Sequence, residues 1–420
     1  MHVEWTLNQY ITYVLLSLVF ISSWVDINGI YSELPQLVLT QPESWKLGAY
    51  IALITNFGNI APFLLVLIKC LYRKHIINPV PINYIVILVG MLSCFLLIFF
   101  WSYTTIIANE KRSTVLLILA FFLSLLDCTS SISFADYICR FRKEFTSTIF
   151  LGDSLNSILP SVLAIAQGNG RIYCVELTNR TNETTAVYQT ARFSVSVYFL
   201  CLFTLFTISF IAFVLLQWTS IARNSHQMVP ETSLEIMNTN HKPQKSLTTS
   251  TYLLLSLGCT YSSSILFGML FSVATYVLMP YGHEIFYLGT IISPWMFTIV
   301  WIIGIIKPII AKRYLLILII LGSITFVFDM IATFKSPCPS FVGTTKRSVL
   351  ILIIWLSTYI LLGYPRLVIA NYVRIYSTNG MFWFGANVQL GALIGSIVAY
   401  LLVETFSLFR ERKACEQVIF

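Results

Sequence analysis

The chain has 420 residues, of which 57% are apolar and only 10% are charged, and its mean hydropathy is +0.80. About a quarter of the residues in a soluble domain are charged, so this chain has too little charge to cover a water-facing surface. A soluble enzyme, a disordered chain and a nucleic-acid-binding domain are therefore excluded. The net charge of +8 does not alter this, because Lys and Arg are dispersed along the chain. The composition predicts an all-α, polytopic membrane protein.

Eleven apolar segments are long enough to cross a bilayer, which takes roughly 20 residues. We expect about eleven transmembrane helices, at 10–31, 47–69, 81–101, 114–134, 147–168, 194–217, 250–279, 285–307, 314–334, 348–373 and 381–404. Short polar clusters separate most of them, and two longer loops cover 169–193 and 218–249.

The longer of these loops, 218–249, follows the sixth predicted span and reads as a cytosolic linker. It separates an N-terminal six-helix half (1–217) from a C-terminal five-helix half (250–404), which is followed by a tail (405–420). Many transporters use two halves that rock about a site near the membrane midplane. The alternative is an incidental long loop, since no repeat is visible in the residues.

The distribution of Lys and Arg gives a weak indication of orientation. Over the whole chain they divide almost evenly between the two sides, but up to residue 160 a cytosolic N-terminus places six inside and three outside. The two N-x-T sequons, at Asn179 and Asn182, both fall in the loop that this orientation places outside. We therefore expect two glycosylation sites, a cytosolic N-terminus and an extracellular C-terminal tail.

Polar side chains in the first span share one helical face. Trp24, Asn28 and Tyr31 follow the spacing i, i+4, i+7, with Glu33 nearby. This pattern indicates a ligand-binding face that combines aromatic rings with an amide. An interfacial aromatic belt is the alternative, although a belt does not require Asn28.

The fourth and fifth spans carry acids within apolar sequence. Asp127 shares a face with Ser124, and Asp153 and Asn156 begin a polar strip along the fifth span. Ionisable groups inside a membrane usually face the bundle interior, where they line a pathway, carry protons or join helices. We predict that Asp153 and Asn156 line the pathway, whereas ligand or proton work and a purely structural role remain equal alternatives for Asp127.

In the second half, Gly391 and Gly395 follow a GxxxG spacing that allows a neighbouring helix to approach closely. Gln389 on the same helix is expected to reach a central cavity. Arg366, in the tenth span, is expected near the cytosolic end or paired with an acid.

No motif for catalysis, metal binding or a cofactor appears, so the sequence predicts no enzyme and no cofactor. A carrier is the first hypothesis, ahead of a channel. The candidate lining groups are aromatics, amides, hydroxyls and a few acids, with few cations at depth. They suit a neutral, planar molecule that forms hydrogen bonds, such as a nucleoside or a flavin.

Several segments, in order, resemble the eukaryotic riboflavin transporter family. The first span reads SWVDINGIYSELPQLV, where the family shows SW-x-x-NG-x-W-x-ELP, and PESW follows, where it shows PEGW. The other resembling segments are LLDCTSSISF (125–134), FLGDSLNSILPSVLAIAQGNG (150–170), SPCPSFVGTT (336–345) and GANVQLGALIGS (385–396). The chain departs from the pattern at Tyr31, at FGMLFSVATY (267–276) and at SPW (293–295).

The resemblance implies uptake of riboflavin across the plasma membrane by alternating access. It also implies eleven spans in two pseudo-symmetric halves (6+5), similar to the major facilitator and equilibrative nucleoside carriers. A nucleoside carrier and a non-transporting membrane receptor remain alternatives. The expected substrate is riboflavin, the expected surroundings are the lipid bilayer, and the chain is expected to act as a monomer without nucleic acid.

Carried over residue by residue, the resemblance implies flavin contacts at Trp24, Asn28, Glu33, Asp127, Ser130 and Gln389. The ring would stack on Trp24 or Tyr31, and its imide edge would meet Asn28 and Gln389. In the expected topology three cysteines face the oxidising outer side, and a disulfide between Cys338 and Cys415 is preferred because both lie near the outer ends of the second half.

Overall fold

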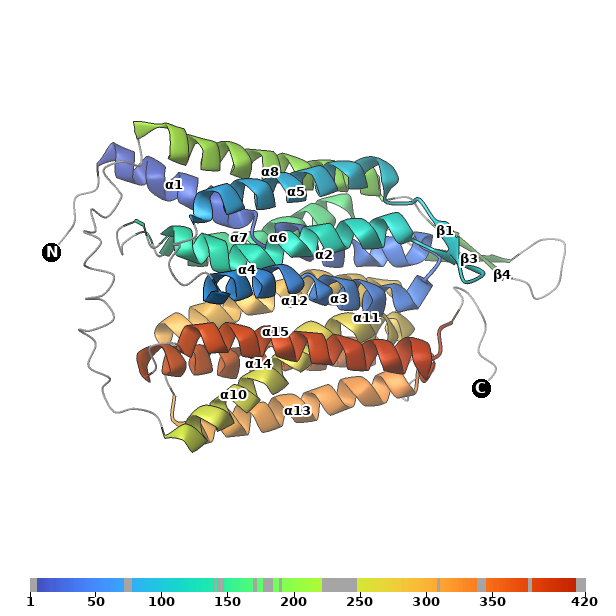
Figure 1. The fold of residues 1–420 in the computed structure, drawn as a ribbon. Coiled ribbons are helices and arrows are strands. Elements are labelled where there is room, and N and C mark those ends of the chain that lie inside the picture. Colours follow the sequence, from blue (N-terminus) through green and yellow to red (C-terminus); the bar gives the residue numbers. More distant parts are fainter. Residues whose placement is uncertain are drawn as a thin grey trace.

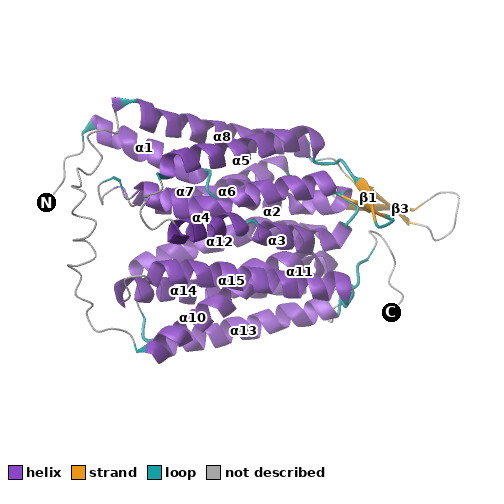
Figure 2. Cartoon of the chain, in the orientation of Figure 1, coloured by secondary structure: helices purple, strands orange, loops and turns teal. Residues whose placement is uncertain are grey.

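The computed structural model describes residues 6–71, 78–138, 140–141, 145, 147–168, 172–176, 184–188, 191–220, 248–307, 310–337, 345–376 and 380–412. These residues form a bundle of roughly parallel and antiparallel helices, with two short β-hairpins at one end (Figures 1 and 2). The described end of the chain beyond α15 also lies near the hairpins, whereas α1 begins at the opposite end (Figure 1).

The helices of the first half are α1 (Leu7–Ile21), α2 (Val25–Thr40), α3 (Leu47–Phe57), α4 (Ile60–Leu71), α5 (Pro79–Phe100), α6 (Thr114–Ile138), α7 (Ser147–Gln167) and α8 (Val195–Trp218). The hairpins are β1 (Thr105–Ile107) with β2 (Glu110–Arg112), and β3 (Ile172–Glu176) with β4 (Thr184–Tyr188), both antiparallel. Pro79 occupies the first position of α5, where its missing N–H would have no partner within the helix. The side chain of the preceding residue, Asn78, caps the helix by accepting a hydrogen bond from the Val80 amide (3.2 Å).

The helices of the second half are α10 (Thr249–Ser263), α11 (Leu270–Leu278), α12 (His283–Ile306), α13 (Lys312–Phe334), α14 (Thr345–Tyr376) and α15 (Gly380–Tyr400). A π-helical segment, Ser264–Met269, joins α10 to α11, so that Thr249–Tyr281 forms one long crossing. In Figure 1 these helices occupy the lower part of the bundle, and α12 also packs against α2 and α7 of the first half.

Within the described residues, eight helices are long and apolar enough to span a membrane, or nine if the bent pair α1–α2 forms one span. The predicted spans at 114–134 and 147–168 are helical, as α6 and α7, and the described part of α6, Thr114–Ser130, is a shorter apolar helix. Asp153, Asn156 and several serines lower the hydropathy of α7. The multi-span helical fold is confirmed, whereas the count of eleven spans is not.

The first predicted span is bent by 51° between α1 and α2. At the break, the hydroxyls of Ser22 and Ser23 donate to the carbonyls of Val19 (2.8 Å) and Phe20 (2.7 Å). Serine hydroxyls that bond back to the preceding turn compete with helix continuation. Trp24 follows as the N-cap of α2, with a backbone that is neither helical nor extended (φ −147°, ψ 9°). Discontinuous helices of this kind often border transporter cavities.

The close packing predicted for the α15 glycines is confirmed. A Cβ atom on Gly391 would lie 2.2 Å from the Thr260 carbonyl oxygen, and one on Gly395 would lie 2.0 Å from the Ser264 carbonyl oxygen. Gly268 meets Gly395 from the opposite side, with its Cβ position 2.5 Å from the Gly395 backbone. Small residues at this crossing let the backbones touch, which stabilises helix pairs in lipid.

Candidate functional site

A central cavity of about 430 Å³ lies between the two halves. Helices α2, α3, α6 and α7 form the wall on the side of the first half, and α12, α14, α15 and the segment from Ser264 to α11 form the opposite wall. Its size falls in the range of pockets for small ligands, about 300–1,000 Å³. Trp301 near the end of α12 and Phe384 near the start of α15 also line it, so the cavity extends toward the end of the bundle opposite the hairpins.

The structure brings most of the candidate residues from separate spans to this cavity. Those on its wall are Trp24, Asn28, Tyr31, Asp153, Asn156 and Gln389. They come from the break before α2, from α2 itself, from α7 and from α15. The spacing that predicted a common face for Trp24, Asn28 and Tyr31 therefore describes their placement correctly, even though the helix is broken beside Trp24.

A side-chain network holds Asn28 in place. Its amide donates to Asn156 of α7, at 3.3 Å from the side-chain oxygen and 3.4 Å from the backbone oxygen. Asn156 in turn donates to the Ser23 hydroxyl (3.1 Å) and accepts from the Ser157 hydroxyl (3.1 Å). Amides fixed by such a network present a defined pattern of donors and acceptors to a ligand.

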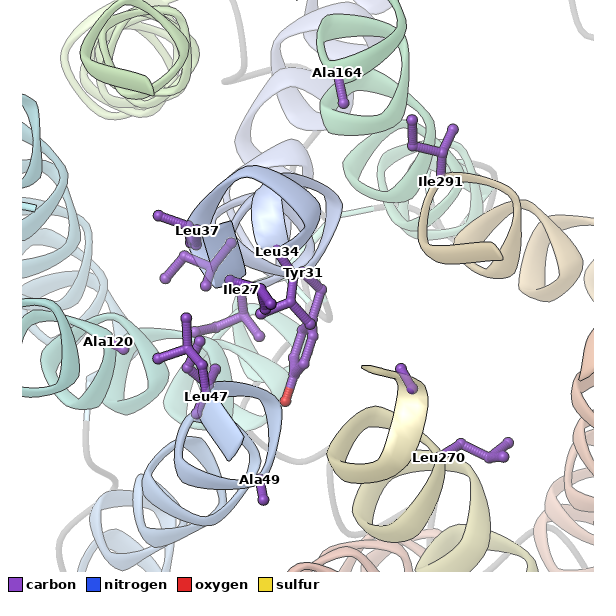
Figure 3. Packing of buried hydrophobic residues seen from close by; sticks show 14 of the residues in the cluster. Ile27, Tyr31, Leu34, Leu37, Leu47, Ala49, Ala120, Ala164, Leu270 and Ile291 are labelled. Atoms are coloured by element: carbon purple, nitrogen blue, oxygen red, sulfur yellow. The ribbon is translucent and has the colours of Figure 1, made fainter. Parts of the chain in front are cut away.

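Aromatic side chains supply the apolar surface of the cavity. Tyr31 reaches from α2 toward α3 (Figure 3). Its ring stacks on Phe271 with centroids 4.2 Å apart and an interplanar angle of 25°. Phe267 and Phe297 form a second stack, with centroids 5.5 Å apart and an angle of 17°. Phe267 and Phe271 belong to the segment 267–276, in which the sequence departs from the family pattern. Phe297 lies in α12, outside the segments that carry the resemblance.

Arg366 corrects two expectations. It lies on the cavity wall, with its guanidinium carbon 4.5 Å from the centroid of Phe267, and is not paired with an acid within the described residues. The sequence argument that few cations occur at depth therefore missed one. Pro365 precedes it within α14, which continues to Tyr376.

Three candidate contacts lie behind the cavity wall rather than on it. Glu33 is 1% exposed and accepts a hydrogen bond from the Gln167 amide (2.9 Å). Ser130 donates to the Ser23 carbonyl oxygen (3.2 Å) and joins α6 to the α1–α2 break. Asp127 is fully buried, and its carboxyl group lies close to that of Asp26. In the described structure these groups join helices, and Ser124 and Cys128 line the cavity from α6 instead.

The cavity wall carries one acid and one base. Among the described residues that line the cavity, Asp153 and Arg366 are the two ionisable ones with an acidic or basic side chain, and no ion pair within 4.0 Å joins them. They lie on opposite walls, in α7 and α14. This arrangement suits a ligand without net charge that can make hydrogen bonds to both a carboxyl group and a guanidinium.

An ionic cluster joins the halves at the hairpin end. Glu404, just after α15, contacts Lys46 (2.9 Å) and Arg112 (3.1 Å), and Arg112 also bonds to the Tyr50 hydroxyl. Tyr50 packs edge-on against Tyr400 with centroids 5.3 Å apart. We name Lys46, Tyr50, Arg112 and Glu404 the ionic latch.

Uncharged hydrogen bonds between the halves support the ionic latch. Thr275 donates to the Trp45 carbonyl oxygen (2.7 Å), and Tyr287 donates to the Ala164 carbonyl oxygen (2.8 Å). Nε2 of His283 lies 3.1 Å from the Pro35 carbonyl oxygen. Together these contacts join the halves between the cavity and the hairpins.

Four candidate sites lie outside the described residues. They are the sequon residues Asn179 and Asn182 and the cysteines Cys338 and Cys415. Glycosylation and the disulfide therefore stay predictions.

Solved structures with this helix arrangement include transporters. The nucleoside transporter NupG matches with a TM-score of 0.56 and 12% identity, covering 96% of this chain and 92% of the other. A bacterial homologue of the human lysosomal transporter Spinster, in an inward-facing and unoccupied conformation, matches with a TM-score of 0.54 and 14% identity, covering 96% and 83%. These likenesses identify a fold of the major facilitator type.

Sequence relatives are more specific. Riboflavin transporter member 3-A of Danio rerio is 31% identical over 432 residues, which cover 94% of this chain and 96% of the relative. Riboflavin transporter member 3 of Homo sapiens is 27% identical over 462 residues, covering 97% and 98%. The model of solute carrier family 52, riboflavin transporter, matches residues 8–411. With a family match over nearly the whole chain and a cavity built from the segments that carry the resemblance, the chain belongs to solute carrier family 52, the riboflavin transporters.

Proposed function

We propose that this chain carries riboflavin across a membrane. The observation that carries the proposal is the convergence of family-like segments from α2, α7 and α15 on one cavity, whose wall carries one acid, Asp153, and one base, Arg366. Aromatic rings offer stacking surfaces for a planar ring system, and Asn28, Asn156 and Gln389 offer amides to its polar groups. Membership of the family and the names of the relatives support riboflavin as the cargo.

Alternating access is the proposed mechanism. The halves are joined at the hairpin end by the ionic latch, and the cavity extends toward the opposite end. Rocking of one half against the other would break the latch and close the opposite end around a loaded cavity. Because both walls come from one chain, we propose that a monomer completes the site.

Uptake of labelled riboflavin by cells that express the chain tests this function. We expect uptake above that of control cells, with competition by unlabelled riboflavin and little competition by uridine. Stronger competition by uridine would instead indicate a nucleoside carrier, and binding without uptake would indicate a receptor.

Asn28→Ala removes the amide that Asn156 holds on the wall, and we expect uptake at equal surface level to fall about tenfold. Unchanged uptake would remove Asn28 from the site.

The proposed location is the plasma membrane, with the N-terminus in the cytosol and the C-terminal tail outside. The hairpin β3–β4 flanks the loop with the sequons, so this orientation places the latch end outside. We expect treatment with an N-glycosidase to lower the apparent mass, and the double variant Asn179→Gln, Asn182→Gln to lack this shift. A protein whose mass does not change on treatment with the glycosidase would contradict the proposed orientation.

The proposed disulfide between Cys338 and Cys415 has a separate test. After alkylation without reduction, the intact mass shows whether these two cysteines carry the alkyl group or are bonded to each other.

A further inference from the structure

Arg366, Phe267 and Phe297 form a shelf on the second-half wall of the cavity. The guanidinium carbon lies 4.5 Å from the centroid of the Phe267 ring and 5.9 Å from that of Phe297, and these two rings are stacked on each other. Attraction between a cation and an aromatic face holds the planar guanidinium in position. The shelf therefore supplies a fixed set of donors rather than a mobile charge.

The donors of this shelf have no protein acceptor in the described ranges. No carboxylate lies within 4.0 Å of Arg366, and no described side chain or backbone oxygen accepts a hydrogen bond from it. A guanidinium stays charged and carries five N–H donors in a planar fork. Leaving such donors unused at depth in a membrane protein is costly, so the group is suited to acceptors that arrive with a ligand.

The opposite wall has complementary chemistry. Asp153 of α7 lines the cavity one turn before Asn156, and its carboxyl oxygens have no ion-pair partner among the described residues. A carboxyl group accepts hydrogen bonds from hydroxyls. The cavity thus offers N–H donors on one wall and oxygen acceptors on the other, so it can orient a ligand that is itself polarised.

We infer that Arg366 recognises the pyrimidine-dione edge of riboflavin and that the Asp153 side of the cavity receives the hydroxyls of the ribityl chain. This inference rests on the proposed function. The dione edge presents the carbonyl oxygen on C2 and the adjacent ring nitrogen N1 as a pair of acceptors to the guanidinium fork, while the ribityl chain presents four hydroxyls. A phosphate or carboxylate cargo fits less well, because Asp153 shares the cavity and opposes added negative charge. The orientation differs from the one expected from the sequence, in which the imide edge meets Asn28 and Gln389.

Binding of riboflavin and 2-thioriboflavin to the purified full-length chain tests this assignment. Sulfur is a weak acceptor compared with oxygen, so the wild-type chain should prefer riboflavin by about tenfold. We expect Arg366→Gln to weaken riboflavin binding by about tenfold and to bind the two flavins equally. Arg366→Lys keeps the charge without the fork and should recover only part of the preference. Arg313→Gln is the matched control, since Arg313 stacks on the exposed Tyr314 outside the cavity, and it should retain the full preference.

Several results would overturn the inference. These are equal binding of the two flavins by the wild-type chain, an undiminished preference in Arg366→Gln, or tighter wild-type binding of riboflavin 5′-phosphate than of riboflavin. The comparison of ligands on the wild-type chain holds even if Arg366→Gln fails to fold. A wild-type chain that binds no flavin would refute the riboflavin assignment itself, and this result is distinct from binding without discrimination.

Discussion

Gly395→Ala is expected to lower the stability of the purified protein more than any single change at the cavity wall. The new Cβ would lie 2.0 Å from the Ser264 carbonyl oxygen and 2.7 Å from its carbon, so helix backbones rather than flexible side chains would have to move. Overpacking in a tight core costs about 1–3 kcal/mol, and a backbone clash belongs at the upper end. Thermal unfolding in detergent, followed by fluorescence-detected gel filtration, measures the effect.

Gly258→Ala is the matched control for this change. Gly258 also lies within a helix of the second half, but the nearest atom to its new Cβ would be Ile319 Cδ1 at 3.4 Å, an ordinary contact. Alanine costs less backbone entropy than glycine in a helix, so this variant should unfold at the wild-type temperature or slightly above. Equal loss of stability in the two variants would show that the α15 crossing is not a special constraint.

Glu404→Gln is expected to shift the protein toward a conformation that is open at the hairpin end. Glu404 bridges Lys46 and Arg112, which come from the first half. Its neutralisation removes the carboxylate that these two cations share, and leaves Arg112 paired only with Glu110 of its own hairpin. Partly exposed ion pairs contribute up to about 1 kcal/mol each, so losing two changes the ratio of conformations by up to about thirtyfold. Labelling of Thr275→Cys by an impermeant maleimide measures the shift, since Thr275 is fully buried between the halves.

The labelling must be compared with two reference proteins. Glu404→Gln without Thr275→Cys corrects for labelling of the native cysteines. Glu284→Gln, combined with Thr275→Cys, removes an exposed acid from the first turn of α12 near the hairpin end. We expect Glu284→Gln to label at the rate of the parent. If Glu404→Gln also labels at the parental rate, the ionic latch does not control the closure of this end.

Much of the first-half site could be predicted because one helical face carries it. The spacing of Trp24, Asn28 and Tyr31 places their side chains on a stripe, and the same reasoning applies to Asp153 and Asn156. A stripe does not show which neighbouring helix it faces. Asp127 has a spacing as regular as these, yet it faces Asp26 behind the wall. That outcome depends on how α6 is rotated against α2, which a single helix pattern does not specify.

The second-half wall was harder to predict, since aromatic residues in a span are usually lipid-facing or part of the core. Phe267 and Phe297 stand thirty residues apart, and nothing in either segment indicates that their rings stack. Arg366 becomes interpretable only once that stack is known, because the two rings replace the acid that a buried cation usually has. Glycine spacing on α15 was a safer signal, since close backbone approach leaves few alternatives.

The acid and the base on the two walls of the cavity bear on the driving force for transport. While Asp153 and Arg366 keep opposite charges, a cavity that carries an uncharged vitamin moves no net charge when its access changes sides. A transmembrane voltage performs work only on net charge, about 2.3 kcal/mol per elementary charge for 100 mV. Such a cycle would be electroneutral, and the cell's resting potential would neither concentrate the cargo nor hold it back. Net accumulation would then depend on chemical conversion of the vitamin after it arrives.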